Sequence, residues 1–410
     1  MVKRALIMVE GTRSKSVLYV EAARRLGLHP ITLAADPAHY HYLEAIENET
    51  IRVDTGDLDL LIRECSRVRA TYDIAGITSA QEASYAVAGK LCRHFELPGP
   101  NPTSIERCCD KFTQRQLLAE GGVPIPAYRL AANATEVESA ATEIGLPVIV
   151  KPAVGSGSSG VRLCRDTAEL AEHASYLFGK THVWRSSPRI LVEEFAQGPY
   201  YTVDMMGNEV VGIYDGDFGP PPHFVFREFT LPALLTDEEH ERIANVSRDC
   251  LRALGLGWGP TCIEFRWTKL GPVVIEVNPR LGGAPGPQMV HLAYGIDLVS
   301  EHIKLAIGRE WDLRRRRSEY TGARILVPDR DGILDRINGD RRAAAVPGVA
   351  EVKIYAKPKA KIIRKEDYRD WIGYVIAVSN CRAKTETILR RAVDLIDWSI
   401  TPFATRDNQE

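Results

Sequence analysis

Residues 273–283 read Val-Val-Ile-Glu-Val-Asn-Pro-Arg-Leu-Gly-Gly, and residues 261–267 before them read Thr-Cys-Ile-Glu-Phe-Arg-Trp. Both runs are rich in apolar and β-branched residues, and Lys-Leu-Gly at 269–271 lies between them as a turn. A hairpin centred on Leu270 would place Glu264 directly opposite Glu276. Because side chains alternate across a strand, Asn278 would share the face of Glu276. The pattern therefore predicts two carboxylates and an amide oxygen that converge on one face.

Glu264, Glu276 and Asn278 are accordingly the predicted metal ligands. Facing carboxylates repel each other unless a cation lies between them. Hard oxygen ligands that act together with substrate phosphates suit Mg²⁺, with Mn²⁺ as the alternative. An exposed hairpin face with ordinary charges is the competing interpretation, and the apolar character of both strands disfavours it.

The residues that follow the second strand complete this predicted site. Pro279 ends the strand, and Arg280 leads into Gly282 and Gly283. This order places a guanidinium group at the mouth of the site.

A second signal precedes the hairpin and has the residue types that bind phosphate. Lys151 ends an apolar run at 148–151, and Gly-Ser-Gly-Ser-Ser-Gly follows at 155–160. Val-Arg-Leu at 161–163 predicts another strand, so this loop is neither a dinucleotide-binding turn nor a Walker loop. A glycine-rich hairpin can still cover a triphosphate with backbone N–H groups and hydroxyls, and Lys151 would supply a positive charge. The alternative is a mobile surface hairpin with a solvated lysine.

A third signal is the run Ile-Leu-Val-Glu-Glu-Phe-Ala-Gln-Gly at 190–198. An apolar strand that ends in two acids and an aromatic residue is typical of a hinge that pairs its backbone with an adenine edge. It is equally typical of a core strand that ends at the surface.

Bulk properties exclude several classes of protein. The chain has 410 residues, a hydrophobic fraction of 45%, a charged fraction of 26% and a formal net charge of -2. This balance gives no general attraction to nucleic acid. The four arginines at 314–317 are interpreted as a solvated, domain-linking run, with a polyanion site as the less favoured alternative. No apolar run is long enough to span a membrane. The eight cysteines lack metal-ligand spacing, which favours free thiols in the cytoplasm.

The order of expected elements predicts three domains. Strands at 5–9, 31–34, 50–53 and 74–78 alternate with helices, which predicts a Rossmann-like parallel sheet with helices on both faces. A proline-rich linker at 97–102 precedes one helix over 104–119. Strands at 323–327, 349–355 and 373–379, with a helix at 384–396, predict a smaller C-terminal α+β domain. The expected domains are 1–103, 104–310 with a lid lobe at about 115–195, and 311–410.

Taken together, these motifs resemble the ATP-grasp superfamily. The resemblance rests on the Asp-Lys pair ending at Lys111, the lysine and loop at 151–160, the acids at 193–194, Glu264, and residues 276–283. It covers roughly residues 1–310. The tail, with Val-Pro-Gly-Val at 346–349 and Asp-Trp-Ile-Gly-Tyr-Val at 370–375, is similar to the C-terminal domain of amino-acid ligases.

The resemblance implies an ATP-grasp fold, with a central two-lobed ATP-binding body, and specific roles for the residues. Lys111, Lys151 and the loop with Ser156, Gly157 and Ser158 would bind the phosphates. Adenine would lie against Glu193, Glu194, Phe195 and Ala196. The Mg²⁺ ligands would be Glu264, Glu276 and Asn278. Arg280 would face the acyl phosphate and act with Lys151 in catalysis, and Gly282 and Gly283 would adjoin the substrate. One departure is Tyr200, which occupies a position where relatives often place a glutamate near the ribose.

The function so implied is an ATP-dependent ligase, which converts a carboxylate into an acyl phosphate and passes it to an amine. Its partners would be a small-molecule carboxylate, expected to be an amino acid, and an amine, and a homodimer is compatible with the chain. His223 and Arg227, in a loop rich in proline, are expected at the acceptor site or on a rigid surface loop. One alternative is a bicarbonate-using carboxylase, which the lack of a Met-Lys carrier motif disfavours. The other is a non-catalytic nucleotide-binding regulator, which the presence of Lys151, Glu276 and Asn278 disfavours.

Overall fold

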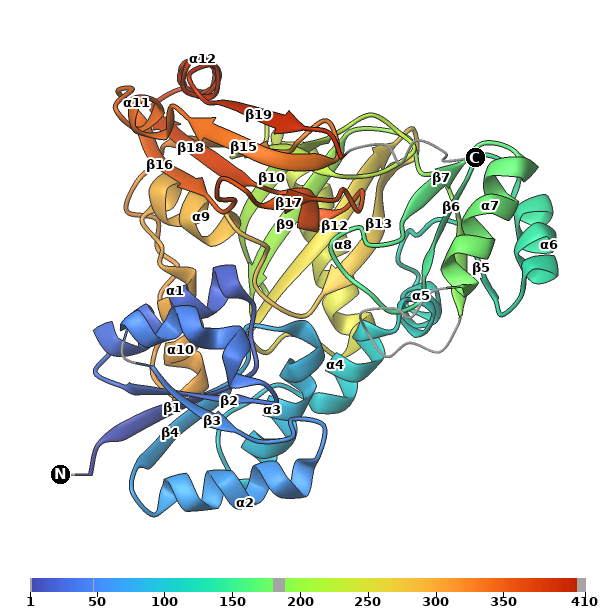
Figure 1. Ribbon diagram of the computed structural model, residues 1–410. Coiled ribbons are helices and arrows are strands. Elements are labelled where there is room, and N and C mark those ends of the chain that lie inside the picture. The colour runs from blue at the N-terminus through green and yellow to red at the C-terminus, as the bar shows by residue number, and fades with distance from the viewer. Residues whose placement is uncertain (1, 47, 180–188, 404–410) are drawn as a thin grey trace, which may run out of the picture.

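The computed structural model describes residues 2–46, 48–179 and 189–403 (Figure 1). Its N-terminal unit is a parallel sheet with helices on both faces, as the alternating pattern predicted. The hydrogen-bonded order of strands is β3 (Glu49–Arg52), β2 (His29–Ala34), β1 (Arg4–Val9) and β4 (Asp73–Thr78). Helix α1 (Arg13–Arg25) covers one face, while α2 (Leu58–Arg69) and α3 (Glu82–His94) cover the other. Successive residues of β1 therefore alternate between two apolar cores.

A long antiparallel sheet forms the centre of the molecule. Its described strands follow the order β13 (Gly271–Asn278), β12 (Pro260–Thr268), β9 (Tyr200–Met206), β10 (Glu209–Phe218), β11 (Phe226–Leu231), β14 (Tyr320–Leu326), β18 (Gly373–Ser379) and β16 (Val349–Ile354). The predicted hairpin register is confirmed, because Glu264 pairs with Glu276 and Cys262 pairs with Asn278. A bulge next to Glu264 shifts the register in the rest of the hairpin.

The C-terminal strands belong to two sheets, one of which is the central sheet. Strand β14 pairs with β11, so that β14, β18 and β16 extend the central sheet. Helix α12 (Arg382–Val393) packs on this extension. A small further sheet joins β17 (Lys361–Ile362), β15 (Gly332–Asn338) and β19 (Asp397–Thr401). The domain boundary near residue 310 stays a prediction, and hydrogen bonds cross it.

Helices fill the space beside and below the central sheet. Helix α8 (Asp237–Leu254) begins at a capping box between Thr236 and Glu239, and it packs on β9, β12 and β13. Helices α9 (Gly286–Tyr294) and α10 (Leu298–Ala306) lie between the sheet and the N-terminal unit, with α10 against α1 (Figure 1). No helix in the described residues is long and apolar enough to cross a membrane.

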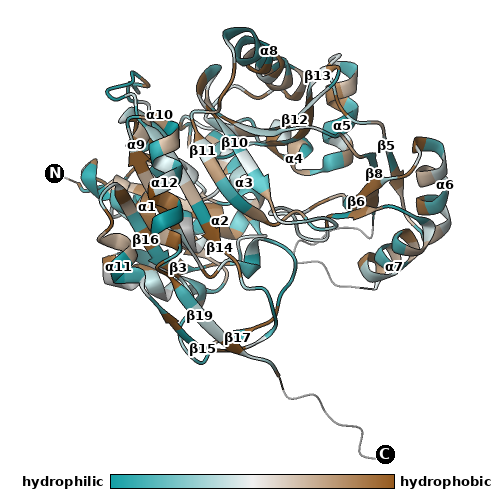
Figure 2. Ribbon diagram, turned by 90° about the horizontal axis from the view of Figure 1, so that it is seen from above, coloured by the Kyte–Doolittle hydropathy of each residue, from teal (hydrophilic) through white to brown (hydrophobic). Residues whose placement is uncertain are grey.

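The lid lobe is a second antiparallel sheet covered by two helices. Its strands follow the order β5 (Tyr128–Ala131), β8 (Ile190–Glu194), β6 (Val148–Pro152) and β7 (Arg162–Cys164), and its helices are α6 (Ala134–Ile144) and α7 (Thr167–Phe178). In Figure 2 the inner strands β6 and β8 are coloured as hydrophobic, in agreement with the buried core that they share with both helices. Strands β6 and β7 pair, so the glycine-rich segment joins two strands as predicted. Part of the predicted lid range, 180–188, lies outside the described residues.

The single helix predicted over 104–119 is wrong, because the structure has two helices there. They are α4 (Pro102–Cys109) and α5 (Lys111–Glu120). Asp110 between them is extended, with φ -93° and ψ 109°, and its carboxylate accepts a hydrogen bond from Thr113 N. A short acidic side chain caps a new helix in this way and ends the previous one. The break places Lys111 in the first turn of α5, which packs on α8 rather than within the lid sheet.

Candidate functional site

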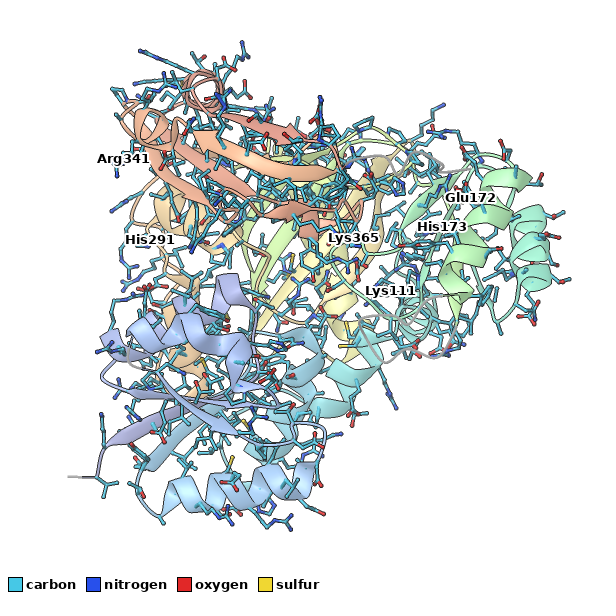
Figure 3. The ribbon with its side chains drawn as sticks, viewed as in Figure 1. Lys111, Glu172, His173, His291, Arg341 and Lys365 are labelled. Atoms are coloured by element: carbon cyan, nitrogen blue, oxygen red, sulfur yellow. The ribbon has the colours of Figure 1, made fainter. Side chains whose placement is uncertain are left out.

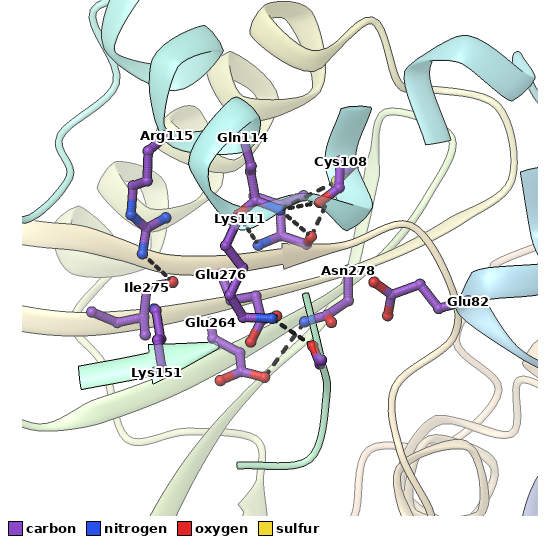
Figure 4. Close-up of polar contacts among 12 residues, drawn as sticks. Glu82, Cys108, Lys111, Gln114, Arg115, Lys151, Glu264, Ile275, Glu276 and Asn278 are labelled. Carbon is purple, nitrogen blue, oxygen red and sulfur yellow. Dashed lines mark hydrogen bonds and ion pairs between the residues drawn. The ribbon is translucent and has the colours of Figure 1, made fainter. Parts of the chain in front are cut away.

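The predicted metal ligands lie together on β12 and β13. Glu264 and Glu276 face each other, and Asn278 Nδ2 lies 3.5 Å from Glu264 Oε1 (Figure 4). Burial, together with the charge of Glu276, raises the pKa of Glu264 to about 7. Within the described residues, no group of three or more His, Cys, Asp and Glu side chains could hold a metal ion by itself. Two carboxylates and an amide fit Mg²⁺, whose remaining ligands are commonly water and substrate phosphates.

Two buried lysines adjoin this pair of acids. Lys111 Nζ lies 2.7 Å from Glu276 Oε1, and Figure 3 shows Lys111 where α5, the lid and the central sheet meet. Burial acts to raise the pKa of Glu276, but Lys111 and Lys151 outweigh it and lower the pKa. Lys111 Nζ also donates to Gly155 O at 2.5 Å, which ties it to the glycine-rich loop. Lys111 therefore connects Glu276 to the glycine-rich loop.

Lys151 is held by an ion pair inside the protein. Its Nζ contacts Glu193, and Arg115 Nε lies 2.6 Å from Glu193 Oε1. The side chain of Glu193 is 3% exposed, so its carboxylate binds two cations of the protein. The ATP-binding role expected for Glu193 stays a prediction, and its observed contacts position Lys151. Sequence reasoning missed Arg115, because an arginine in an amphipathic helix carries no signal that it is buried.

A cavity opens between the lid and the central sheet. Every predicted ATP-binding residue lines it, together with the predicted metal ligands and Arg280. They are Lys111, Lys151, Ser156, Gly157, Ser158, Glu193, Glu194, Phe195, Ala196, Glu264, Glu276, Asn278 and Arg280. Gly282 and Gly283 instead line a neighbouring cavity. His223 and Arg227 line neither, and Arg227 Nη1 donates to Val327 O at 3.3 Å. Their place at the substrate site stays a prediction without a supporting contact.

Tyr200 lines both cavities and makes its part of the wall aromatic. Its ring packs edge-on against Phe218 and Phe226, with centroid distances of 4.8 Å and 5.3 Å. The guanidinium of Arg266 lies 5.4 Å from the centre of the Tyr200 ring. Thr202 Oγ1 donates to the Tyr200 hydroxyl at 3.0 Å. The departure noted at position 200 therefore places a buried aromatic ring in the wall of both cavities.

Arg280 links the site to the N-terminal unit. Its Nε lies 3.1 Å from Glu82 Oε2, in the first turn of α3, and its Nη2 donates to Asn278 Oδ1 at 3.1 Å. Sequence reasoning missed Glu82, which lies 198 positions from Arg280 and belongs to no recognisable motif. The guanidinium group is thus fixed in direction before any substrate binds.

The glycine-rich loop contacts the C-terminal region directly. Gly157 has φ 67°, and a Cβ atom there would come within 2.3 Å of the Tyr368 ring. Gly157 O accepts a hydrogen bond from Tyr368 N at 3.2 Å, and Arg369 Nη2 donates to Ser159 Oγ at 3.2 Å. Glycine at position 157 is therefore required both by the backbone and by the close approach of the ring.

Family models match three separate stretches of the chain. Residues 144–288 match the ATP-grasp domain, residues 20–99 match the ATP-grasp N-terminal domain, and residues 324–401 match the L-amino acid ligase C-terminal domain 2. "Uncharacterized protein y4rH" of Sinorhizobium fredii is 60% identical over 408 residues, which cover 100% of this chain and 85% of that protein. This chain belongs to the ATP-grasp family.

Two further relatives show how this ATP-grasp protein compares with named enzymes. Carnosine synthase 1 of Mus musculus is 28% identical over 330 residues, which cover 75% of this chain and 40% of the synthase. The chain thus matches about two-fifths of that enzyme's length. The crystal structure of L-amino acid ligase from Bacillus licheniformis superposes with a TM-score of 0.84 at 20% identity, covering 97% of this chain and 99% of the ligase. The ATP-grasp fold predicted from the sequence is confirmed.

Proposed function

We propose that this ATP-grasp protein joins the carboxylate of an amino acid to an amine through an acyl phosphate, with release of ADP and phosphate. The observation that carries the proposal is the grouping of Lys111, Lys151, the facing acids and Arg280 around one cavity under a glycine-rich loop. The match of residues 324–401 to the L-amino acid ligase C-terminal domain supports an amino acid as the carboxylate substrate.

In the first step, a carboxylate oxygen of the substrate forms a bond to the γ-phosphorus of ATP, and the bond from that phosphorus to the β,γ-bridging oxygen breaks. ADP leaves with the electron pair. Lys111 and Lys151 neutralise the phosphate oxygens, since phosphoryl transfer depends mostly on positioning and charge. The loop at 155–160 excludes water from the reacting groups. Glu264, Glu276 and Asn278 would hold a magnesium ion, which would supply further positive charge to the phosphates.

In the second step, the neutral amine attacks the acyl carbon and the phosphate leaves with the electron pair of the carbon–oxygen bond. Negative charge develops on the carbonyl oxygen during this attack. Arg280 is the residue that stabilises this charge, because Glu82 and Asn278 hold its guanidinium in place. The proton lost by the amine passes to the departing phosphate or to water.

Isotopic labelling tests the route. The purified chain is supplied with Mg²⁺, ATP, an amine and an amino acid whose carboxylate oxygens are ¹⁸O, and the products are analysed by mass spectrometry. We expect one label in inorganic phosphate and ADP formed in step with the amide. Label in AMP with release of pyrophosphate would show adenylation and overturn the proposal. The Glu276→Ala variant, treated identically, controls for contaminating ATPases.

A further inference from the structure

A second cavity, of about 450 Å³, adjoins the nucleotide cavity and shares Glu264, Arg280 and Tyr200 with it. Residues of the N-terminal unit, the central sheet and the C-terminal region contribute to its wall. A molecule in this cavity would therefore lie directly beside the phosphates bound in the first one. A pocket of this size suits a small organic substrate.

One end of the cavity carries Lys15, a buried lysine without a partner in the described residues, and Arg280. Lys15, on α1, is 7% exposed, and no hydrogen bond or ion pair ends at its Nζ within the described residues. Burial, together with the charge of Arg280, lowers the pKa of Lys15 to about 7. A buried ammonium group without a partner is costly, and an anion beside it would remove that cost. Lys15 and Arg280 together therefore favour a carboxylate.

Asp204 supplies the opposite charge in the same cavity. It is 2% exposed, and its Oδ2 accepts a hydrogen bond from Tyr214 Oη at 2.7 Å. Its Oδ1 lies beside the backbone of Gly282, and it has no hydrogen bond of normal geometry in the described structure. Burial raises the pKa of Asp204. An ammonium group of a ligand would satisfy the free oxygen.

The rest of the wall is largely aromatic. Phe226 and Phe229 stack with their ring centres 4.6 Å apart, and Trp371 and Met289 also line the cavity. The Trp371 indole Nε1 is buried without a hydrogen-bond partner in the described residues. These side chains would surround a large apolar group and exclude a charged one.

We propose that this cavity binds the carboxylate donor, and that the donor is an α-amino acid with an aromatic side chain. Its carboxylate lies between Lys15 and Arg280, its ammonium group lies at Asp204, and its side chain packs on Phe226, Phe229 and Trp371. The assignment rests on the proposed function, since it places the donor carboxylate next to the γ-phosphate. It adds a substrate class, together with Lys15 and Asp204 as the residues that recognise the substrate.

Binding and trapping measurements test the assignment together. Calorimetry of the chain with Mg²⁺ and a non-hydrolysable ATP analogue compares L-phenylalanine, L-tryptophan, L-alanine and L-glutamate. In parallel, ATP and hydroxylamine convert any acyl phosphate into a hydroxamate, whichever amine is the natural acceptor. We expect phenylalanine and tryptophan to bind at least about tenfold more tightly than alanine or glutamate, a difference of about 1.4 kcal/mol. We expect the same two amino acids to give the hydroxamate.

Variants assign the contacts. Asp204→Asn should weaken binding of L-phenylalanine about tenfold and leave 3-phenylpropionate, which lacks the ammonium group, unchanged. Lys15→Met should weaken binding of both compounds. Trp371→Phe keeps a ring and so tests the wall without emptying it. Tyr72→Ala, which removes an aromatic ring stacked on His29 in the N-terminal unit, is the control.

The outcomes separate this inference from the proposed function. Hydroxamate formed with alanine or glutamate but not with aromatic amino acids would overturn the substrate class and leave the ligase function standing. Tight binding of phenylalanine without ADP release would support the cavity assignment and remove the proposed reaction. If Asp204→Asn weakened the binding of L-phenylalanine and of 3-phenylpropionate equally, the assignment of Asp204 to the ammonium group would be overturned.

Discussion

Glu264 and Glu276 lie directly opposite each other across β12 and β13, yet their surroundings separate their acidities. Burial and the neighbouring acid raise the pKa of Glu264 to about 7, whereas Lys111 and Lys151 overcome burial and lower the pKa of Glu276. Glu276 therefore stays ionised at neutral pH while Glu264 is partly protonated. A cation that enters between them meets the negative charge of Glu276 at once. It meets a second negative charge when Glu264 loses its proton.

Removal of Glu276 should slow turnover strongly. We expect Glu276→Ala to lower kcat by about two to three orders of magnitude, the range seen when one preorganised stabilising group is lost. Circular dichroism and thermal melting should show that the fold is retained. Glu209→Ala, at an exposed acid on β10, should leave kcat unchanged. A folded Glu276→Ala protein with near-normal activity would remove Glu276 from the metal site.

Lys151 should be needed for nucleotide binding. Lys151→Ala removes a charge-assisted contact worth about 1.5–3 kcal/mol, so ATP affinity should fall by roughly ten- to a hundredfold. Lys151→Arg should restore it only in part, because a planar guanidinium does not replace a compact ammonium group and Glu193 is already bound by Arg115. Titration with a fluorescent ATP analogue measures the effect. ATP affinity equal to that of the unmodified chain in Lys151→Ala would contradict the assignment.

The ion pair between Arg115 and Glu193 should contribute strongly to stability. Both side chains are almost inaccessible to solvent, at 1% and 3% exposure, so Arg115→Ala leaves a buried carboxylate with Lys151 alone. We expect the free energy of unfolding to fall by about 3–5 kcal/mol. Arg129→Ala breaks an arginine–glutamate pair that is about half exposed, and it should cause a much smaller change. Urea unfolding measures the free energy of unfolding of both variants. Equal losses of stability in Arg115→Ala and Arg129→Ala would contradict the prediction.

Acid should destabilise the protein partly through His302. This imidazole is buried between the hydroxyls of Tyr19 and Tyr85, at 2.6 Å and 3.0 Å, and burial lowers its pKa to about 3. The unfolded chain binds the proton near pH 6.5, so this contribution to stability is complete above pH 6.5. It is lost as the pH falls toward 3, by up to about 1.4 kcal/mol per pH unit.

The measurement is the free energy of unfolding of the original chain and of His302→Gln at pH 8 and pH 5. We expect the variant to be less stable at pH 8 and to lose less stability on acidification. His240→Gln, at an exposed position of α8, should follow the original chain. If His302→Gln lost as much stability between pH 8 and pH 5 as the original chain, other groups would account for the acid sensitivity.

Local patterns predicted the elements that carry the residues proposed to bind phosphate and metal. The alternation around Leu270 predicted the pairing of Glu264 with Glu276, because register in a short hairpin follows from its turn. The strand-like Val-Arg-Leu after the glycine-rich loop correctly predicted the pairing of β6 with β7. Both predictions rest on the order of residues within segments of about twenty residues.

Contacts between distant segments could not be predicted in this way. Glu82, Lys15 and Arg115 reach the site from helices whose sequences show ordinary amphipathic patterns. The pairing of β11 with β14 joins segments about a hundred residues apart, and no local signal selects one edge strand as the partner of another. The sequence left His223 either at the acceptor site or on a rigid surface loop, and it could not show that Phe224 and Phe226 of the same segment line the cavities.

The pairing of β11 with β14 has a consequence for any shortened form of this protein. A chain that ended near residue 310 would keep every residue of the nucleotide cavity, yet β11 would lose its neighbour from Thr321 to Arg324. The unpaired N–H and C=O groups of that strand would then form an open sheet edge, which promotes association with other chains. In the complete structure, β14 covers this edge of β11.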